Sequence, residues 1–156
     1  MTAATTLQSA DLKTDAWFFE LLTESYARLV GSALVPPGKD ATWLYRDAPF
    51  VVLAHGTGPD PHFIYANKAA EGCFGYAWEQ FLALPSRLSA ETQDQAERQS
   101  LLDQVHRDGI ISGYRGVRIA KSGQRFIIDH GVIWELIDLQ GTRHGQAATF
   151  ASWRDV

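Results

Sequence analysis

Five residues of this sequence have side chains suited to holding a small molecule: Arg87, Arg115, His130, Trp134 and Thr149. His130 and Trp134 are four residues apart in an apolar stretch, and a strand places such residues on one face. A two-residue turn at Ser122-Gly123 puts Arg115 opposite His130. We therefore expect a cavity with His130, Arg115 and Thr149 as polar anchors and Trp134 as an apolar wall. The alternative is that His130 bonds to neighbouring protein groups and that side chains fill the space.

Arg87 follows Pro85 and Ser86, at the edge of the expected pocket mouth. Its guanidinium suits a carboxylate or a phosphate, because it presents paired N–H donors to both oxygens. Two other roles stay open, since Arg87 could instead cap the neighbouring helix end or bridge to Glu91.

The opposite face of the long strand carries Asp129 and Glu135, with Arg118 diagonal to Asp129 in the expected register. We expect this face to meet water and Arg118 to form a surface ion pair. The two acids are roughly 20 Å apart along a strand and so cannot act as an acid–base pair on one substrate.

Metal and haem sites find little support in the spacing of ligand-type residues. His55 and His62 have no third ligand nearby, so no zinc site is expected. Haem could be held by His55, His130 or His106, and a haem protein or an enzyme using the same cavity is kept as an alternative. Cys73 lies on an apolar helical face and is expected to be a small buried hydrophobe.

These residues are expected to be positioned by an α+β fold. Strands at 50–55 and 63–66 precede a helical middle, and three strands at 110–120, 125–137 and 143–153 follow in a meander. One face of the long strand is apolar apart from one histidine, so we expect helices to cover it: Phe126, Ile128, His130, Val132, Trp134 and Leu136. The face parity of the last strand is open, because a bulge at Gly141 would reverse it.

The chain is expected to divide into a flexible tail at 1–13, a helix and linker at 14–47, and one domain at 48–154. Phe18, Leu22, Tyr26 and Leu29 recur at helical spacing, and further apolar residues widen this stripe. Such a helix must bury more than one side, either on its own domain or on a second chain. We expect a homodimer formed through this helix.

Composition argues against several function classes. The 14 basic and 18 acidic residues give a net charge of -4, which is unsuited to nucleic acid as the main partner. No apolar run approaches the roughly 20 residues that cross a bilayer, so no membrane partner is expected. A lone cysteine and the lack of a secretory signal at the start predict a cytoplasmic protein.

The element order resembles that of PAS domains, as do residues 64–70, 74–79 and the two turns at 121–123 and 138–145. More narrowly, the chain resembles the MEKHLA family, a PAS-like group, over about residues 18–154. Five stretches carry this resemblance: 48–55, 60–61, 84–91, 116–119 and 145–148. The run from Pro85 to Glu91 is the most specific of them. The resemblance implies a sensing or binding role, of the kind that occurs as a stand-alone bacterial protein.

Flavin-binding photosensors among PAS domains carry a reactive cysteine after the short-helix pair and a glutamine on the last strand. Residues 85–88 hold no cysteine, and Ala147 falls where the glutamine is expected. Cysteine–flavin photochemistry is therefore not expected, and the cofactor stays unassigned.

Together these observations predict a PAS-like five-stranded antiparallel sheet, with helices over one face and an N-terminal flanking helix. The expected function is a sensory or small-molecule-binding module without catalytic machinery of its own. The alternatives are the haem protein or enzyme named above, and a dimerisation or protein-interaction module with a filled core.

Overall fold

The computed structural model of the protein describes residues 11–156. Six antiparallel strands form one sheet with the order β2-β1-β5-β4-β3, and β6 pairs with β4 beyond the end of β5. The strands are β1 Val51–His55, β2 Phe63–Ala66, β3 Ile110–Ile119, β4 Arg125–Ile137, β5 Arg143–Phe150 and β6 Ser152–Asp155. The helices are α2 Ala16–Val30, α3 Ala41–Arg46, α4 Lys68–Phe74, α5 Trp78–Leu82, the 3-10 helix η1 Ser86–Ser89 and α6 Thr92–Asp108.

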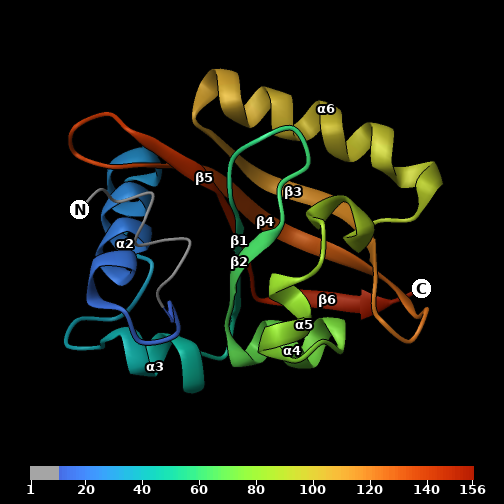
Figure 1. Ribbon diagram of the computed structural model, residues 1–156, viewed down its shortest axis with the longest axis horizontal. Coiled ribbons are helices and arrows are strands. Elements are labelled where there is room, and N and C mark those ends of the chain that lie inside the picture. The colour runs from blue at the N-terminus through green and yellow to red at the C-terminus, as the bar shows by residue number, and fades with distance from the viewer. Residues whose placement is uncertain (1–10) are drawn as a thin grey trace.

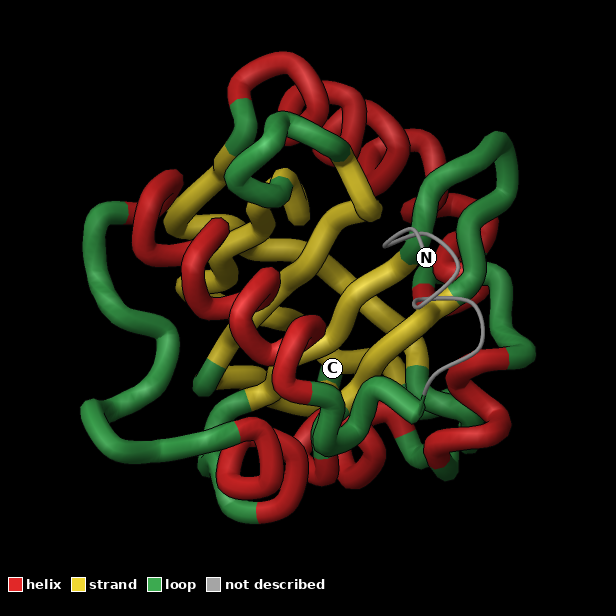
Figure 2. The backbone as a smooth tube through the Cα atoms, turned by 60° about the vertical axis from the view of Figure 1, so that its left-hand side comes forward, coloured by secondary structure: helices red, strands yellow, loops and turns green. Residues whose placement is uncertain are grey.

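The sheet lies between two helical layers, each enclosing its own apolar core (Figure 1). Helices α2 and α3 lie on one side, which we call the outer face, and α2 crosses in front of the strands in the turned view (Figure 2). Helices α4, α5 and α6 lie on the other side, the inner face. The expected α+β plan is confirmed. It gains a sixth strand because the chain bends at Ala151, after which β6 pairs with the first half of β4.

Asp15 is the N-cap of helix α2. Its carboxylate accepts a hydrogen bond from the N–H of Phe18. The helix ends at Gly31, whose φ of 88° is a left-handed conformation that glycine adopts without strain.

The apolar side of α2 packs on the outer face of the chain's own sheet. The indole N–H of Trp134 donates to Ser25 Oγ at 3.0 Å, and the Tyr26 ring lies edge-on against Trp134 with centroids 4.9 Å apart. Trp17 similarly meets His144 edge-on. The surplus apolar surface that suggested a dimer is thus used within the chain, and homodimerisation stays a prediction.

The segment expected to be a linker contains helix α3, which is capped by Asp40. Leu44 and Tyr45 of this helix are buried in the outer core. Of the expected tail, residues 1–10 lie outside the described part of the chain, whereas Leu12 is buried in the same core. The packed part of the chain therefore includes Leu12.

Strand β4 changes faces at a bulge. Gly116 and Tyr114 of β3 pair with Ile128 and Gly131, so that two residues of β4 oppose one residue of β3. His130 within the bulge has a φ of 54°, which is uncommon for a side chain with a Cβ.

The bulge decides which core each half of β4 enters. Phe126 and Ile128 lie in the inner core, as Ile133 does after the bulge, while Trp134 and Leu136 lie in the outer core. We predicted that the even-numbered residues from Phe126 to Leu136 share one face of the sheet. This prediction is wrong, because the extra residue in the bulge reverses the alternation of faces.

The β3–β4 hairpin is offset by one residue from the expected register. Arg118 pairs with Phe126, since the turn is longer than two residues and the Ala120 N–H bonds to the Gln124 carbonyl. Residues directly opposite one another share a face, so Arg118 lies on the inner face. The predicted surface pair of Arg118 with Asp129 is wrong.

Asn67 joins β1 to the helices on either side of it. Its side-chain oxygen accepts from the N–H groups of Val52 and Ala70, and its amide nitrogen donates to the carbonyls of Leu44 and Phe50. The side chain is fully buried with all four hydrogen bonds made, which is the full capacity of a carboxamide.

The Ser25–Trp134 hydrogen bond is expected to hold α2 on the sheet. Ser25→Ala leaves the buried indole N–H without its acceptor and should lower the free energy of unfolding by about 1–3 kcal/mol in urea titrations. The same substitution in a Trp134→Phe background should cost much less, because the orphaned donor is gone. Thr23→Ala, on the same helix, should stay within about 0.5 kcal/mol of the wild type. Equal costs in both backgrounds would contradict this role.

The left-handed backbone of His130 gives a second test. His130→Gly should keep or raise the melting temperature, whereas His130→Val should cost about 1–2 kcal/mol, since a β-branched residue is strained at positive φ. At Arg115, an exposed β3 position without positive φ, the order should reverse and valine should be the better residue. Thermal unfolding of the four variants compares them, and the same order at both positions would show that the bulge imposes no strain.

Candidate functional site

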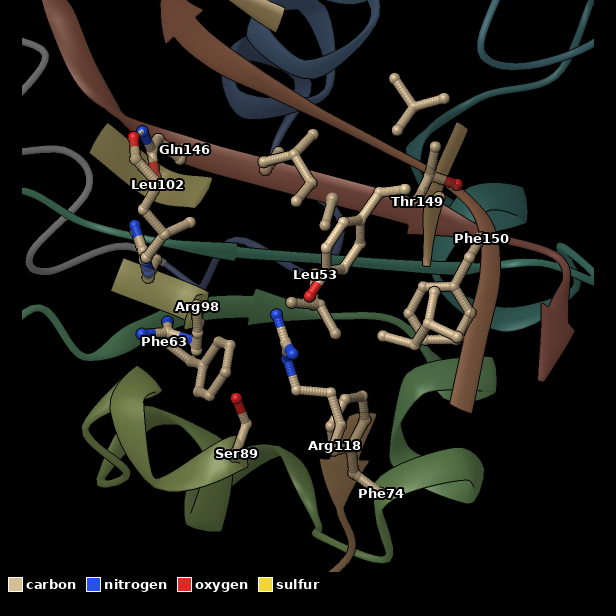
Figure 3. Close-up of a pocket in the computed structure, with 18 residues that line it drawn as sticks. Leu53, Phe63, Phe74, Ser89, Arg98, Leu102, Arg118, Gln146, Thr149 and Phe150 are labelled. Atoms are coloured by element: carbon tan, nitrogen blue, oxygen red, sulfur yellow. Dashed lines mark hydrogen bonds between the residues drawn. The ribbon is translucent and has the colours of Figure 1, made fainter. Parts of the chain in front are cut away.

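A cavity of about 60 Å³ lies between the inner face of the sheet and the helices α4, η1 and α6. Most of its wall is apolar, and its polar side chains come from β1, η1, α6, β3 and β5. Figure 3 shows Arg98, Ser89 and Gln146 toward one end, with Phe74 and Phe150 toward the other. The space is large enough for a few groups the size of a water molecule.

Two buried arginines reach this cavity, Arg98 from α6 and Arg118 from β3. Each is only 6% exposed, and no acidic residue lines the cavity. Among residues 11–156, neither guanidinium forms an ion pair with a carboxylate. Buried charges in proteins are normally paired, so this arrangement is unusual.

The two positively charged guanidiniums also repel each other, which disfavours the protonated form of Arg98. Burial, and then the charge of Arg118, lower the pKa of Arg98 to about 10. Arg98 nevertheless stays protonated at neutral pH. Arg118 lies over the ring of Tyr114, 5.4 Å from its centroid, which gives partial compensation through a cation–π contact.

Ser86 links Arg98 to His55. Arg98 donates to Ser86 Oγ at 2.8 Å, and Ser86 Oγ lies 2.8 Å from His55 Nδ1. Because a guanidinium only donates, the hydroxyl proton is directed to Nδ1 and the imidazole proton sits on Nε2. Burial, and then the charge of Arg98, lower the pKa of His55 to about 3, so the ring is neutral at physiological pH.

A serine–histidine contact of this length is also the geometry of an activated nucleophile. Here the imidazole is too weak a base to take the hydroxyl proton, given its pKa of about 3. Ser86 is moreover buried and occupied by Arg98. The arrangement is therefore suited to orienting Arg98 rather than to activating Ser86.

A polar row crosses the inner face beside the cavity, formed by His55, Gln146 and Glu135 on adjacent strands. Glu135 is 1% exposed and accepts from Arg143 Nε at 2.7 Å and from Gln146 Nε2 at 3.2 Å. The prediction that Glu135 faces water is wrong, since the bulge turns it inward. Its charge is balanced by Arg143 and does not serve the two cavity arginines.

The MEKHLA domain family matches residues 16–155, nearly the whole chain. This chain belongs to the MEKHLA domain family. No curated protein matches it. Among residues 11–156, no helix has both the length and the apolar character needed to cross a membrane, and no three His, Cys, Asp or Glu side chains gather as a metal site.

Solved structures share the fold of this MEKHLA domain at low sequence identity. A PAS domain from Colwellia psychrerythraea is 17% identical, with a TM-score of 0.59 over 72% of this chain and 90% of that one. A PAS domain from a two-component sensor histidine kinase is 18% identical, with a TM-score of 0.54 over 73% and 91%. An RNA-binding light-oxygen-voltage receptor is 20% identical, with a TM-score of 0.60 over 80% of this chain and 35% of the receptor. The PAS-like fold is thereby confirmed.

The MEKHLA domain places the five predicted anchor residues in different environments. Thr149 is among the lining residues, but it pairs with Val52 and Val132, which pack in the outer core, and its hydroxyl donates to the Val51 carbonyl at 2.8 Å. Arg115 and His130 are exposed, and Trp134 lies in the outer core, on the other side of the sheet. The expected constellation is therefore not brought together.

Arg87 lies in a surface groove that adjoins the cavity. Its side chain is half exposed and pairs with Asp60 at 3.0 Å. The groove and the cavity share His55, Arg98, Leu102 and Gln146, which therefore form the wall between them. Arg87 thus lies in the groove and not in the cavity, and its contact with a ligand stays a prediction.

The polar residues that do line the cavity had partial signals in the sequence. The distinctive run from Pro85 to Glu91 contributes the buried Ser89 to the cavity wall and the buried Ser86 to the contact with Arg98, whereas Arg87 is exposed. Arg98 belongs to helix α6, which has polar residues on nearly all sides. The sequence pattern therefore could not distinguish a buried arginine from a solvent-exposed one. Arg118 could not be placed without the hairpin register.

Haem and flavin do not fit the cavity. Ligands of that size need roughly 300 Å³ or more, several times the space present. No cysteine lines the cavity, and the Cys73 thiol has a pKa raised by burial to about 12. On the last strand Gln146, not Ala147, lines the inner face, because Gln146 pairs with Glu135 and Ala147 with Trp134.

Acid should destabilise this MEKHLA domain through His55. The unfolded ring takes up a proton near pH 6.5, while the folded ring stays neutral down to about pH 3. The unfolded state therefore binds more protons in this interval, and the free energy of unfolding falls by about 1.4 kcal/mol per pH unit below pH 6 from this group alone.

His55→Asn removes the titrating group, so its urea-unfolding free energy should fall less steeply between pH 7 and pH 5. His62→Asn changes an exposed histidine and should keep the wild-type slope. Identical slopes for wild type and His55→Asn would contradict the buried neutral imidazole.

Proposed function

We propose that this MEKHLA domain binds a small molecule in its inner cavity and works as a sensory module. The observation that carries the proposal is the convergence of Arg98, Arg118 and His55 on an enclosed and mainly apolar space. Such a combination is the usual form of a small-molecule site. The sensor histidine kinase among the structural neighbours supports a sensing role by its likeness of fold.

Binding in this cavity would act on the contact between α6 and the sheet. Arg98 and Leu102 belong to α6, while His55 and Gln146 belong to β1 and β5, and the cavity touches all four. Gln146 already spans this contact by donating to the Leu102 carbonyl at 3.0 Å. A ligand that fills the cavity would change how α6 packs against the strands. A sensor depends on such a difference in structure between its free and bound states.

The dimerisation or filled-core module is the less favoured alternative, because side chains do not fill the cavity and the α2 surface is covered within the chain. Homodimerisation, a cytoplasmic location and the lack of a nucleic-acid partner stay predictions.

Native mass spectrometry of freshly purified protein tests the proposal, together with a screen of metabolites for a rise in melting temperature. We expect either a bound mass that denaturation releases or at least one stabilising compound. Ala148→Leu fills the cavity and should abolish the effect, whereas Ala96→Leu on the exposed side of α6 should not. A bare chain mass with no stabilising compound, or undiminished binding by Ala148→Leu, would refute it.

A further inference from the structure

Resting on the proposed function, we infer that the ligand is a small organic monocarboxylate. Its carboxylate lies against Arg98 and Arg118, and its apolar part lies against the hydrophobic end of the cavity. The inference names the charge, the size and the polarity of the ligand, each from a separate feature of the site.

The charge follows from the two unpaired guanidiniums. Both are more than nine-tenths buried, both line the same cavity, and no acidic side chain lines it with them. The nearest buried carboxylate described above, Glu135, is engaged by Arg143. A negative charge in the cavity would therefore balance charge that the described chain leaves unbalanced.

The unused N–H donors of the two arginines also indicate an anionic ligand such as a carboxylate. A guanidinium carries five N–H donors, yet Arg98 makes one side-chain hydrogen bond, to Ser86, and Arg118 makes one, to the Val117 carbonyl. A carboxylate accepts paired N–H bonds in the plane of the guanidinium fork. The bond to Ser86 leaves the other amino group of Arg98 free for such an acceptor.

The rest of the wall excludes a second charge on the ligand. Much of the remaining wall is apolar and is formed by Leu53, Phe74, Ile128, Ile133 and Phe150; Figure 3 shows Phe150 at the end opposite Arg98, and Phe74 beside Arg118. These side chains offer no donor to a second carboxylate or to the remaining oxygens of a phosphate. The apolar end thus favours a hydrocarbon group, and the small volume limits it to a few carbons.

The two arginines are expected to lower the stability of the unliganded protein. This effect distinguishes them from arginines that have a purely structural role. Two like charges buried together without a counter-charge destabilise the folded state, and an apolar replacement of similar length removes that repulsion. Arg98→Met and Arg118→Met should therefore melt at or above the wild-type temperature without ligand. A structural arginine would give the opposite result.

Thermal unfolding with defined probes tests the inference at neutral pH. The probes are n-butyrate and n-valerate, their neutral isosteres butyramide and valeramide, and sodium phosphate and chloride as inorganic anions. The variants are Arg98→Met and Arg118→Met, with Arg115→Met as the control, because Arg115 is an exposed arginine on the same strand as Arg118. Should a methionine variant not fold, Arg98→Lys or Arg118→Lys keeps the charge but loses the planar fork and should weaken carboxylate binding at least about tenfold.

We expect the carboxylates to raise the melting temperature of the wild type and of Arg115→Met, with no response in Arg98→Met or Arg118→Met and none to the amides. Equal responses to acids and amides, or a retained response in the methionine variants, would overturn the carboxylate assignment while leaving a small-molecule site in place. Phosphate or chloride acting as strongly as valerate would also overturn it, in favour of an inorganic anion. If no probe and no metabolite binds, the proposed function fails together with the inference.

Discussion

The bulge in β4 is the constraint on which the two-layer structure depends. One strand supplies Phe126, Ile128 and Ile133 to the inner core and Trp134 and Leu136 to the outer core, and strict alternation cannot place residues 128 and 133 on one side. The extra residue at 129–130 makes this possible, with His130 held at positive φ. Without it Trp134 would turn toward the cavity, and α2 would lose the indole that bonds to Ser25.

The same shift of alternation builds the polar row beside the cavity. It brings Glu135 inward to meet Gln146 and Arg143, while the longer β3–β4 turn brings Arg118 inward beside Phe126. In the polar row the charge of Arg143 is therefore balanced by Glu135, whereas in the cavity the charges of Arg98 and Arg118 have no balancing carboxylate. Within one face, Glu135 therefore has a charged partner, whereas the two cavity arginines have none among residues 11–156.

The sequence was sufficient to predict the family and most elements in their order, because helical spacing, caps and turn residues are local signals. Helix α3 and strand β6, which are short, were not predicted. The sequence was insufficient to predict the site, because the site depends on which face of the sheet each strand residue occupies. A single added residue in the hairpin turn moved Arg118 from the expected surface to the interior, and the bulge exchanged Trp134 for Ile133. Gly123 marks the turn, with a φ of 92°, but a glycine there suits hairpin turns of more than one length. The bulge has no such mark, since His130 adopts its conformation without glycine. The run from Pro85 to Glu91 marked the right neighbourhood, but burial singled out Ser86 there, while Arg87 stayed exposed.

Ile133 and Trp134 are consecutive residues that face different layers, one lining the cavity and the other fixed to α2. The peptide unit between them is rigid and planar, so it cannot move on one side of the sheet while staying still on the other. A displacement of the backbone at Ile133 would therefore also displace Trp134 and its contact with α2, with no chain of intermediate contacts. The cavity and the N-terminal helix thus lie on opposite sides of the sheet, yet the two residues that contact them are joined by a single peptide bond.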